Sequence, residues 1–89
     1  MGETNIFKVL ADSQRRDILT MLKNGRLNAE EIAEELQITP AALSYHLKLL
    51  KSADLVSEYK EKTLFIMKIN TTVFDELIIW VNQFGGKKR

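Results

Sequence analysis

The chain has 89 residues, a formal net charge of +1 and no cysteine. That length predicts one domain over residues 1–89, and the lack of cysteine excludes disulfides, thiolate metal sites and thiol redox sensing. No apolar run approaches the roughly 20 residues that span a bilayer, and the first residues lack a signal-peptide pattern, so we expect a cytoplasmic protein.

Capping residues and helical spacing of apolar residues predict four helices in the first half of the chain. These helices cover residues 5–10, 13–24, 29–36 and 40–53. Asn28 and Glu31 form a capping-box pattern at the start of the third helix. Thr39 fits the N-cap of the fourth helix, and Pro40 fits its first turn, where a missing N–H costs nothing.

The hydrophobic period changes after Asp54. Residues 55–60 and 63–69 are rich in strand formers, with Glu61-Lys62 between them as a hairpin tip. A last helix is expected over residues 72–84, followed by a flexible basic tail at 85–89. The predicted order is therefore ααααββα, a mainly α fold with a β-hairpin.

The third and fourth predicted helices are separated by a short turn, which is typical of a helix-turn-helix. In that motif the first helix supports the second, and the second enters the major groove of DNA. Phosphates would repel the third helix, because it carries Glu30, Glu31, Glu34 and Glu35. The fourth helix carries Lys48 and Lys51 and no acidic residue before Asp54. We therefore expect the fourth helix to enter the groove.

The fourth helix has two faces with different chemistry. Leu43, Leu47 and Leu50 share one face and are expected in the core. The opposite face offers small, hydroxyl and cationic side chains that suit base edges and phosphates, namely Ala41, Ser44, Tyr45 and Lys48. Lys51 suits a phosphate, and Lys60 and Lys62 give the hairpin a basic tip that would touch the DNA backbone beside the helix.

Two segments carry a family resemblance. Residues 7–19 resemble the opening of ArsR-type regulators, and residues 36–48, with Leu50, Ala53, Leu55 and Val56, resemble their recognition-helix signature. The similarity extends over residues 5–84 and implies a winged helix-turn-helix transcriptional repressor. Within the family, residues 70–73 are similar to the opening of the last helix in the SdpR-like autorepressor subgroup.

The resemblance also bears on single residues. It implies that Arg15 and Arg16 contact phosphate, although an internal salt bridge with Asp12 or Asp17 is the alternative. His46 has two open interpretations, because helical spacing puts it on the flank of the core-facing stripe: packing within the protein, or a DNA contact. The candidate DNA-binding residues are Thr39, Pro40, Ala41, Ser44, Tyr45, His46, Lys48, Lys51, Lys60, Lys62, Arg15 and Arg16.

The chain departs from the family in places. It has Ser13 where members usually have Pro, and Gln37 where they often have Gly. Metal-sensing relatives carry cysteines near the third helix or His and Asp clusters on the last one. Here His46 is the single histidine and Asp75-Glu76 lack partners at ligand spacing, so no metal and no cofactor are expected.

The last predicted helix has two apolar stripes. One is formed by Val73, Leu77, Trp80, Val81 and Phe84, and the adjoining one by Phe74, Ile78 and Val81. One stripe can serve the core, and a second one marks an interface unless a small core uses both. The resemblance places a dimer interface on the first and last helices, with the candidate residues Ile6, Phe7, Leu10, Phe74, Leu77, Ile78 and Val81.

These observations predict a homodimeric repressor that binds a palindromic operator on duplex DNA, regulates its own gene and senses no metal. The alternative is a winged-helix module for protein–protein interaction, since the fold also serves that role. An enzyme is disfavoured, because the sequence has no Gly-rich phosphate loop and no nucleophile–His–acid set. The SdpR-like resemblance further implies sequestration by a membrane-bound partner.

Overall fold

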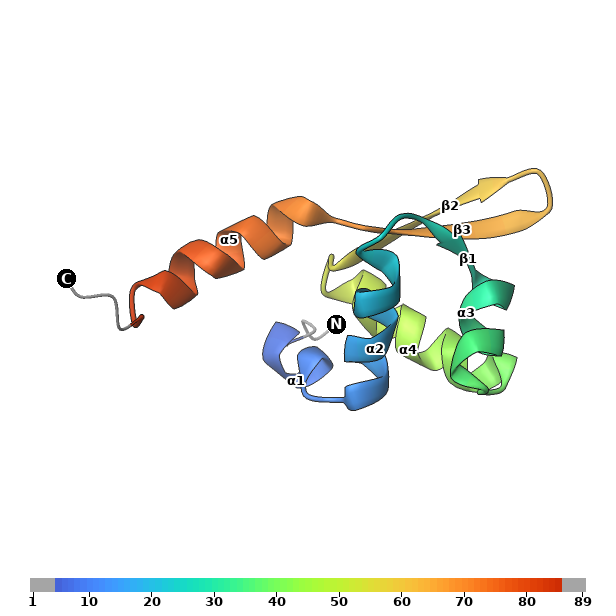
Figure 1. Ribbon diagram of the computed structural model, residues 1–89, viewed down its shortest axis with the longest axis horizontal. Helices are drawn as coiled ribbons and strands as arrows, with labels where there is room; N and C mark the ends of the chain where they lie inside the picture. The colour runs from blue at the N-terminus through green and yellow to red at the C-terminus, as the bar shows by residue number, and fades with distance from the viewer. Residues whose placement is uncertain (1–4, 86–89) are drawn as a thin grey trace.

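The computed structural model describes residues 5–85. Its elements are α1 (Ile6–Leu10), α2 (Ser13–Leu22), β1 (Leu27–Asn28), α3 (Ala29–Leu36), α4 (Pro40–Ser52), β2 (Val56–Glu61), β3 (Leu64–Ile69) and α5 (Thr71–Asn82). Helices α1 to α4 gather into one body, from which the β2–β3 hairpin and α5 extend in opposite directions (Figure 1). The predicted fold, mainly helical with one hairpin, is confirmed.

The predicted boundaries differ from the observed ones by one or two residues at several ends. Helix α2 ends at Leu22, two residues before the predicted Asn24, because the chain turns at Gly25, whose φ of 138° suits glycine. Helix α5 starts one residue early and ends at Asn82. Of the predicted tail, residues 86–89 lie outside the described residues.

One strand was missing from the predicted order. Leu27 and Asn28 form β1, which pairs antiparallel with Met67 and Ile66 of β3. The sheet order is β1-β3-β2, so β3 is its central strand. Two residues are too few to show strand alternation, and Asn28 also caps α3, so the local sequence indicated only the helix.

The core draws at least one apolar side chain from most elements of the body. Ile18 of α2, Ile32 of α3, Leu50 of α4 and Met67 of β3 are fully buried, together with Leu55 before β2. In α4 the buried leucines recur at helical spacing, at Leu43, Leu47 and Leu50, as the sequence predicts. Helix α4 is therefore packed against α2 and α3 on one side, and its opposite side is exposed to solvent.

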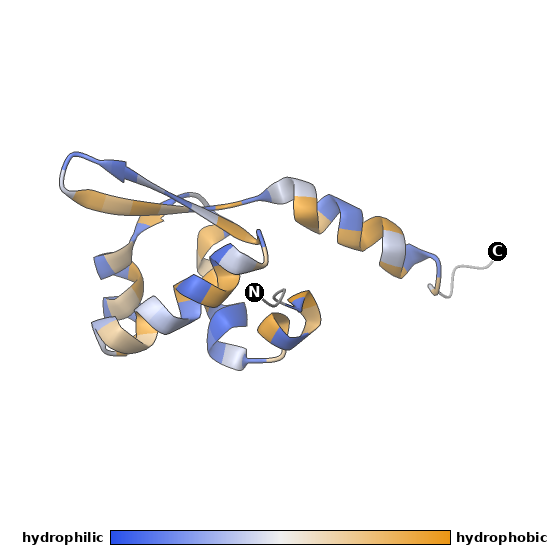
Figure 2. Ribbon diagram, turned by 180° about the vertical axis from the view of Figure 1, so that it is seen from behind, coloured by the Kyte–Doolittle hydropathy of each residue, from blue (hydrophilic) through white to orange (hydrophobic). Residues whose placement is uncertain are grey.

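Helix α5 contributes little to this core. None of its residues is buried, and only Val73 and Phe74 in its first turns pack against the core cluster. The interpretation in which a small core uses both apolar stripes is therefore wrong. Apolar residues recur along the projecting helix (Figure 2). Within residues 5–85, no helix has the length and hydrophobicity to cross a bilayer.

Candidate nucleic-acid interface

The turn between α3 and α4 is fixed by backbone geometry and capping. Gln37 has left-handed angles, with φ 56° and ψ 46°, and Ile38 N–H donates to the Ala33 carbonyl, which closes the end of α3. The Thr39 hydroxyl then accepts the Ala42 N–H at 3.0 Å and begins α4. The two helices are thus joined by three residues in a defined conformation, as a helix-turn-helix requires.

The outer face of α4 is open to solvent. Ala41, Ser44, Tyr45 and Lys48 are all exposed, and 59% of the Tyr45 surface is accessible. Within residues 5–85, the Lys48 ammonium has no hydrogen bond or ion pair. The structure therefore brings together on one surface a small side chain, two hydroxyls and an uncompensated cation. We call these four residues the α4 face.

Lys51 differs from Lys48 although both lie on α4. Its ammonium forms an ion pair with the Glu58 carboxylate of β2, and both side chains are partly buried. The pair fastens the end of α4 to the hairpin and balances the charge that was predicted to meet a phosphate.

The hairpin carries basic residues near its tip, and the tip projects away from the helical body on the side opposite α5 (Figure 1). The Lys60 ammonium lies over the Phe65 ring, 5.8 Å from its centroid, and the two residues are paired across β2 and β3. Lys62 forms the turn with a φ of 60° and is exposed. Both cations therefore lie at the end of the hairpin that is farthest from α5.

A contact between the loop before β1 and the turn half of β2 was not predicted. Arg26 donates a hydrogen bond to the Tyr59 hydroxyl and lies 3.4 Å from the Glu61 carboxylate. These partners raise the pKa of Arg26 further above its ordinary value, the Tyr59 hydrogen bond most and the Glu61 charge next. The residues are 33 positions apart, so no local pattern could have indicated that they meet.

Three candidate DNA-binding residues are engaged within the protein. Arg15 and His46 are buried and hydrogen-bonded to each other. Arg16 donates to the carbonyls of Leu10 and Ala11, at 2.8 and 2.9 Å, and so caps the end of α1. The alternative salt bridges of Arg15 and Arg16 with Asp12 or Asp17 are not formed in the described part of the chain. His46 is thus packed within the protein, as in the first of its two interpretations.

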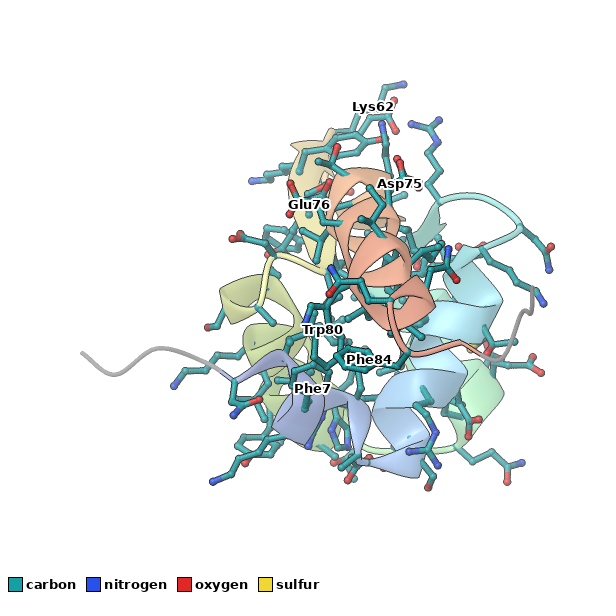
Figure 3. The ribbon with its side chains drawn as sticks, turned by 90° about the vertical axis from the view of Figure 1, so that its left-hand side faces the viewer. Phe7, Lys62, Asp75, Glu76, Trp80 and Phe84 are labelled. Atoms are coloured by element: carbon teal, nitrogen blue, oxygen red, sulfur yellow. The ribbon has the colours of Figure 1, made fainter. Side chains whose placement is uncertain are left out.

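A second surface lies along α5. Phe7 of α1 lies 5.6 Å from Trp80 between ring centroids, and Trp80 lies 5.0 Å from Phe84. Figure 3 shows the three rings clustered between the two helices, with Asp75 and Glu76 on the side turned away from α1. Phe7 thus faces Trp80 of its own chain, next to the surface predicted for the dimer.

Around this cluster, apolar side chains stay open to solvent. Ile78 and Val81, two predicted dimer residues, are about half exposed. Within residues 5–85, no three potential metal-ligating side chains lie together.

A helix-turn-helix followed by a basic hairpin defines the class of winged helix-turn-helix proteins, which bind DNA. The model of the bacterial regulatory protein family arsR matches residues 12–58. The chain is also 37% identical to the transcriptional repressor SdpR of Bacillus subtilis, over 93% of this chain and 92% of that protein. The chain therefore belongs to the ArsR family of bacterial regulatory proteins. This membership places it among transcription regulators and not among enzymes.

Other relatives agree with this assignment. An arsenical resistance operon repressor of Staphylococcus aureus is 33% identical over 84% of this chain and 72% of its own length. Among solved structures, HlyU from Vibrio cholerae matches 92% of this chain and 89% of its own, with a TM-score of 0.74 and 27% identity. A homodimeric winged helix-turn-helix domain from Mycobacterium bovis, a possible ArsR-family regulator, matches 92% and 79%, with a TM-score of 0.74 and 28% identity.

Proposed function

We propose that this protein is a transcriptional repressor that binds duplex DNA as a homodimer, with α4 of each copy in a major groove. The single observation that carries the proposal is the solvent-exposed α4 face, formed by Ala41, Ser44, Tyr45 and Lys48, on a helix whose other side is packed in the core. Thr39 and Pro40, exposed at the start of α4, lie at the end of the helix that contacts base edges in this motif.

The dimer rests on the apolar surface of α1 and α5. Ile78 and Val81 expose a stripe that a second copy would cover, next to Ile6, Leu10 and Leu77, which are half-buried. The homodimeric relative from Mycobacterium bovis supports this assembly. A two-fold dimer presents two recognition helices to successive major grooves about 34 Å apart, so the target is an imperfect palindrome.

Repression follows if the DNA site of the dimer overlaps a promoter. A dimer bound across a promoter excludes RNA polymerase, and we include the promoter of its own gene among the targets. The proposal contains no metal and no cofactor, and it places the protein in the cytoplasm with the DNA. The membrane-bound partner was expected only from the SdpR-like resemblance, and we do not include it in the proposal.

The contacts divide into base readout and backbone positioning. Ser44 and Tyr45 face base edges in the groove, whereas Lys48 and the hairpin residues Lys60 and Lys62 contact phosphates. Lys51 contributes less, because its charge is balanced by Glu58. Three other candidates are hydrogen-bonded within the protein, and we do not assign them a DNA contact: Arg15, Arg16 and His46.

The test is a matched pair of substitutions in equilibrium binding to the DNA upstream of the gene. Lys48→Gln should weaken binding about tenfold or more and lower the salt slope by about two, one phosphate contact for each copy. Lys51→Gln should stay within about threefold, because a glutamine can still hydrogen-bond Glu58. Lys48→Glu should abolish binding while sedimentation still shows the dimer.

Two results would contradict the proposal. Unchanged affinity and salt slope for Lys48→Gln would show that the α4 face does not meet DNA. No binding by the wild-type protein at micromolar concentration and moderate salt would favour the protein-interaction module.

A further inference from the structure

A buried hydrogen-bond cluster joins the recognition helix to the helices beneath it. His46 on α4 is only 8% exposed, and Arg15 on α2 is 9% exposed. His46 Nδ1 lies 3.2 Å from Arg15 Nη1, and His46 Nε2 lies 3.0 Å from Gln14 Oε1. Arg15 Nε also donates to the Val9 carbonyl of α1 at 2.8 Å. Three helices therefore meet at one imidazole ring, which we call the His46 cluster.

The partners of the ring determine which nitrogen carries its proton. A guanidinium has only donors and stays protonated in proteins, so Arg15 must donate and Nδ1 must accept. The single proton of the neutral ring then lies on Nε2, where it donates to Gln14 Oε1. Every polar atom of the cluster is satisfied in this state, and no buried side-chain nitrogen or oxygen among residues 5–85 lacks a partner.

A second proton on the ring would have to enter the contact with Arg15. Nδ1 would change from acceptor to donor and would face another cation at hydrogen-bond distance. The other charged groups around the site are Asp12 at the start of α2 and Lys8 of α1, which lines a cavity of about 470 Å³ with Arg15 and Tyr45. The Asp12 carboxylate accepts the N–H groups of Gln14 and Arg15 and makes no hydrogen bond with the ring, although a charged His46 would lower the pKa of Asp12 through its charge. In this geometry the Arg15 guanidinium keeps its hydrogen bond to the ring only while Nδ1 is unprotonated.

We propose that His46 is a positioning residue for DNA binding, whose neutral Nε2–H form fastens the recognition helix to α1 and α2 and whose protonation releases it. This inference rests on the proposed function. Because Val9 lies on the same helix as Phe7, the cluster also joins α4 to the surface assigned to the dimer. Protonation of Nδ1 should then weaken DNA binding, although it adds positive charge to the protein.

Two substitutions test the contacts of the two ring nitrogens one at a time. His46→Asn places an amide oxygen near the position of Nδ1 and keeps an acceptor for Arg15. His46→Gln reaches toward Gln14 instead and leaves the buried guanidinium without its acceptor, the more costly loss. We expect DNA affinity at pH 7.5 to fall less than about threefold for His46→Asn and about tenfold or more for His46→Gln. Circular dichroism and sedimentation should show both variants as folded dimers.

A pH profile provides the readout that a purely structural role would not change. His46 is the single histidine of the chain, and histidine is the side chain that ordinarily titrates between pH 5 and 8. When the pH is lowered at constant salt, wild-type affinity should fall as Nδ1 gains a proton and the Arg15 hydrogen bond is lost, and His46→Asn should lose much less. Equal profiles for the two proteins, or wild-type affinity in His46→Gln, would overturn the inference.

The tautomer tests the cluster without DNA. Nitrogen-15 NMR of the free protein at pH 7.5 should show a protonated Nε2 and an unprotonated Nδ1, and the opposite tautomer would overturn the inference. A wild-type protein that binds no DNA at any pH would refute the proposed function and, with it, the role of the ring in DNA binding. The observed tautomer would then still decide whether the cluster exists as described.

Discussion

The basic residues of this protein divide according to whether the fold already uses their charge. Lys51 is paired with Glu58, and Arg16 caps the carbonyl end of α1. Arg15 is buried against His46. Lys48 is exposed, and within residues 5–85 it has no partner. Of the four basic residues on α2 and α4, only Lys48 therefore has no partner among residues 5–85, and we propose it as the one that meets DNA. This distinction comes from tertiary contacts, whereas the sequence offered Lys48 and Lys51 from their place on the fourth helix and Arg15 and Arg16 from the family resemblance.

Asp12 is the residue whose electrostatics is most directly measurable. Partial burial raises the pKa of its carboxyl, but the hydrogen bonds from the N–H groups of Arg15 and Gln14, with the charge of Arg15, outweigh this and lower the pKa below the ordinary value of 3.8. A lowered pKa in the folded state means that the ionised carboxylate stabilises the fold. That contribution is complete above the unfolded pKa and is lost as pH falls through the folded one.

We predict that Asp12→Ala lowers the free energy of unfolding by about 1 kcal/mol at pH 7, because it removes the N-cap of α2. Asp12→Asn should stay within a few tenths of a kcal/mol at pH 7, since asparagine caps equally well. Urea unfolding at pH 6 and pH 3 measures both effects. The wild type should lose more stability than Asp12→Asn over this interval, and equal losses would contradict the assigned pKa direction.

At the scale of elements, helix α5 is anchored to the body at its N-cap, and none of its residues is buried. Asn70 caps it, and the same side chain donates to the Asp54 carbonyl at the end of α4. The Asn70 N–H also donates to the Leu55 carbonyl. The start of α5 is thereby tied to the end of α4, which directs the helix away from the body. Its apolar stripe is left for a second copy.

Two neighbouring isoleucines of α5 provide a matched test of that surface. Ile78 is 55% exposed and shares a face with Phe74 and Val81, whereas Ile79 is 66% exposed between Asp75 and Gln83. Ile78→Glu should convert the dimer into a monomer in sedimentation equilibrium, because it buries a charge in the interface. Ile79→Glu should leave the dimer unchanged. Dissociation by both variants, or by neither, would contradict the assigned interface.

At the scale of the whole molecule, the sequence predicted what local chemistry controls. The helices before the hairpin were predicted within two residues because capping residues and helical period are local signals. The exposed side of α4 was predicted for the same reason. Contacts between distant residues were not: Arg15 and His46 are 31 positions apart, and Arg26 and Tyr59 are 33 apart. The direction of α5 depends on Asn70 reaching Asp54, which is also a tertiary contact.

The central claim is that two copies place their α4 helices in successive major grooves of one DNA site. Hydroxyl-radical footprinting of the DNA upstream of the gene tests this most directly. We predict two symmetric protected segments whose centres are about 10 base pairs apart, appearing together as the dimer concentration rises. A single asymmetric segment, or no protection at micromolar protein, would contradict the claim.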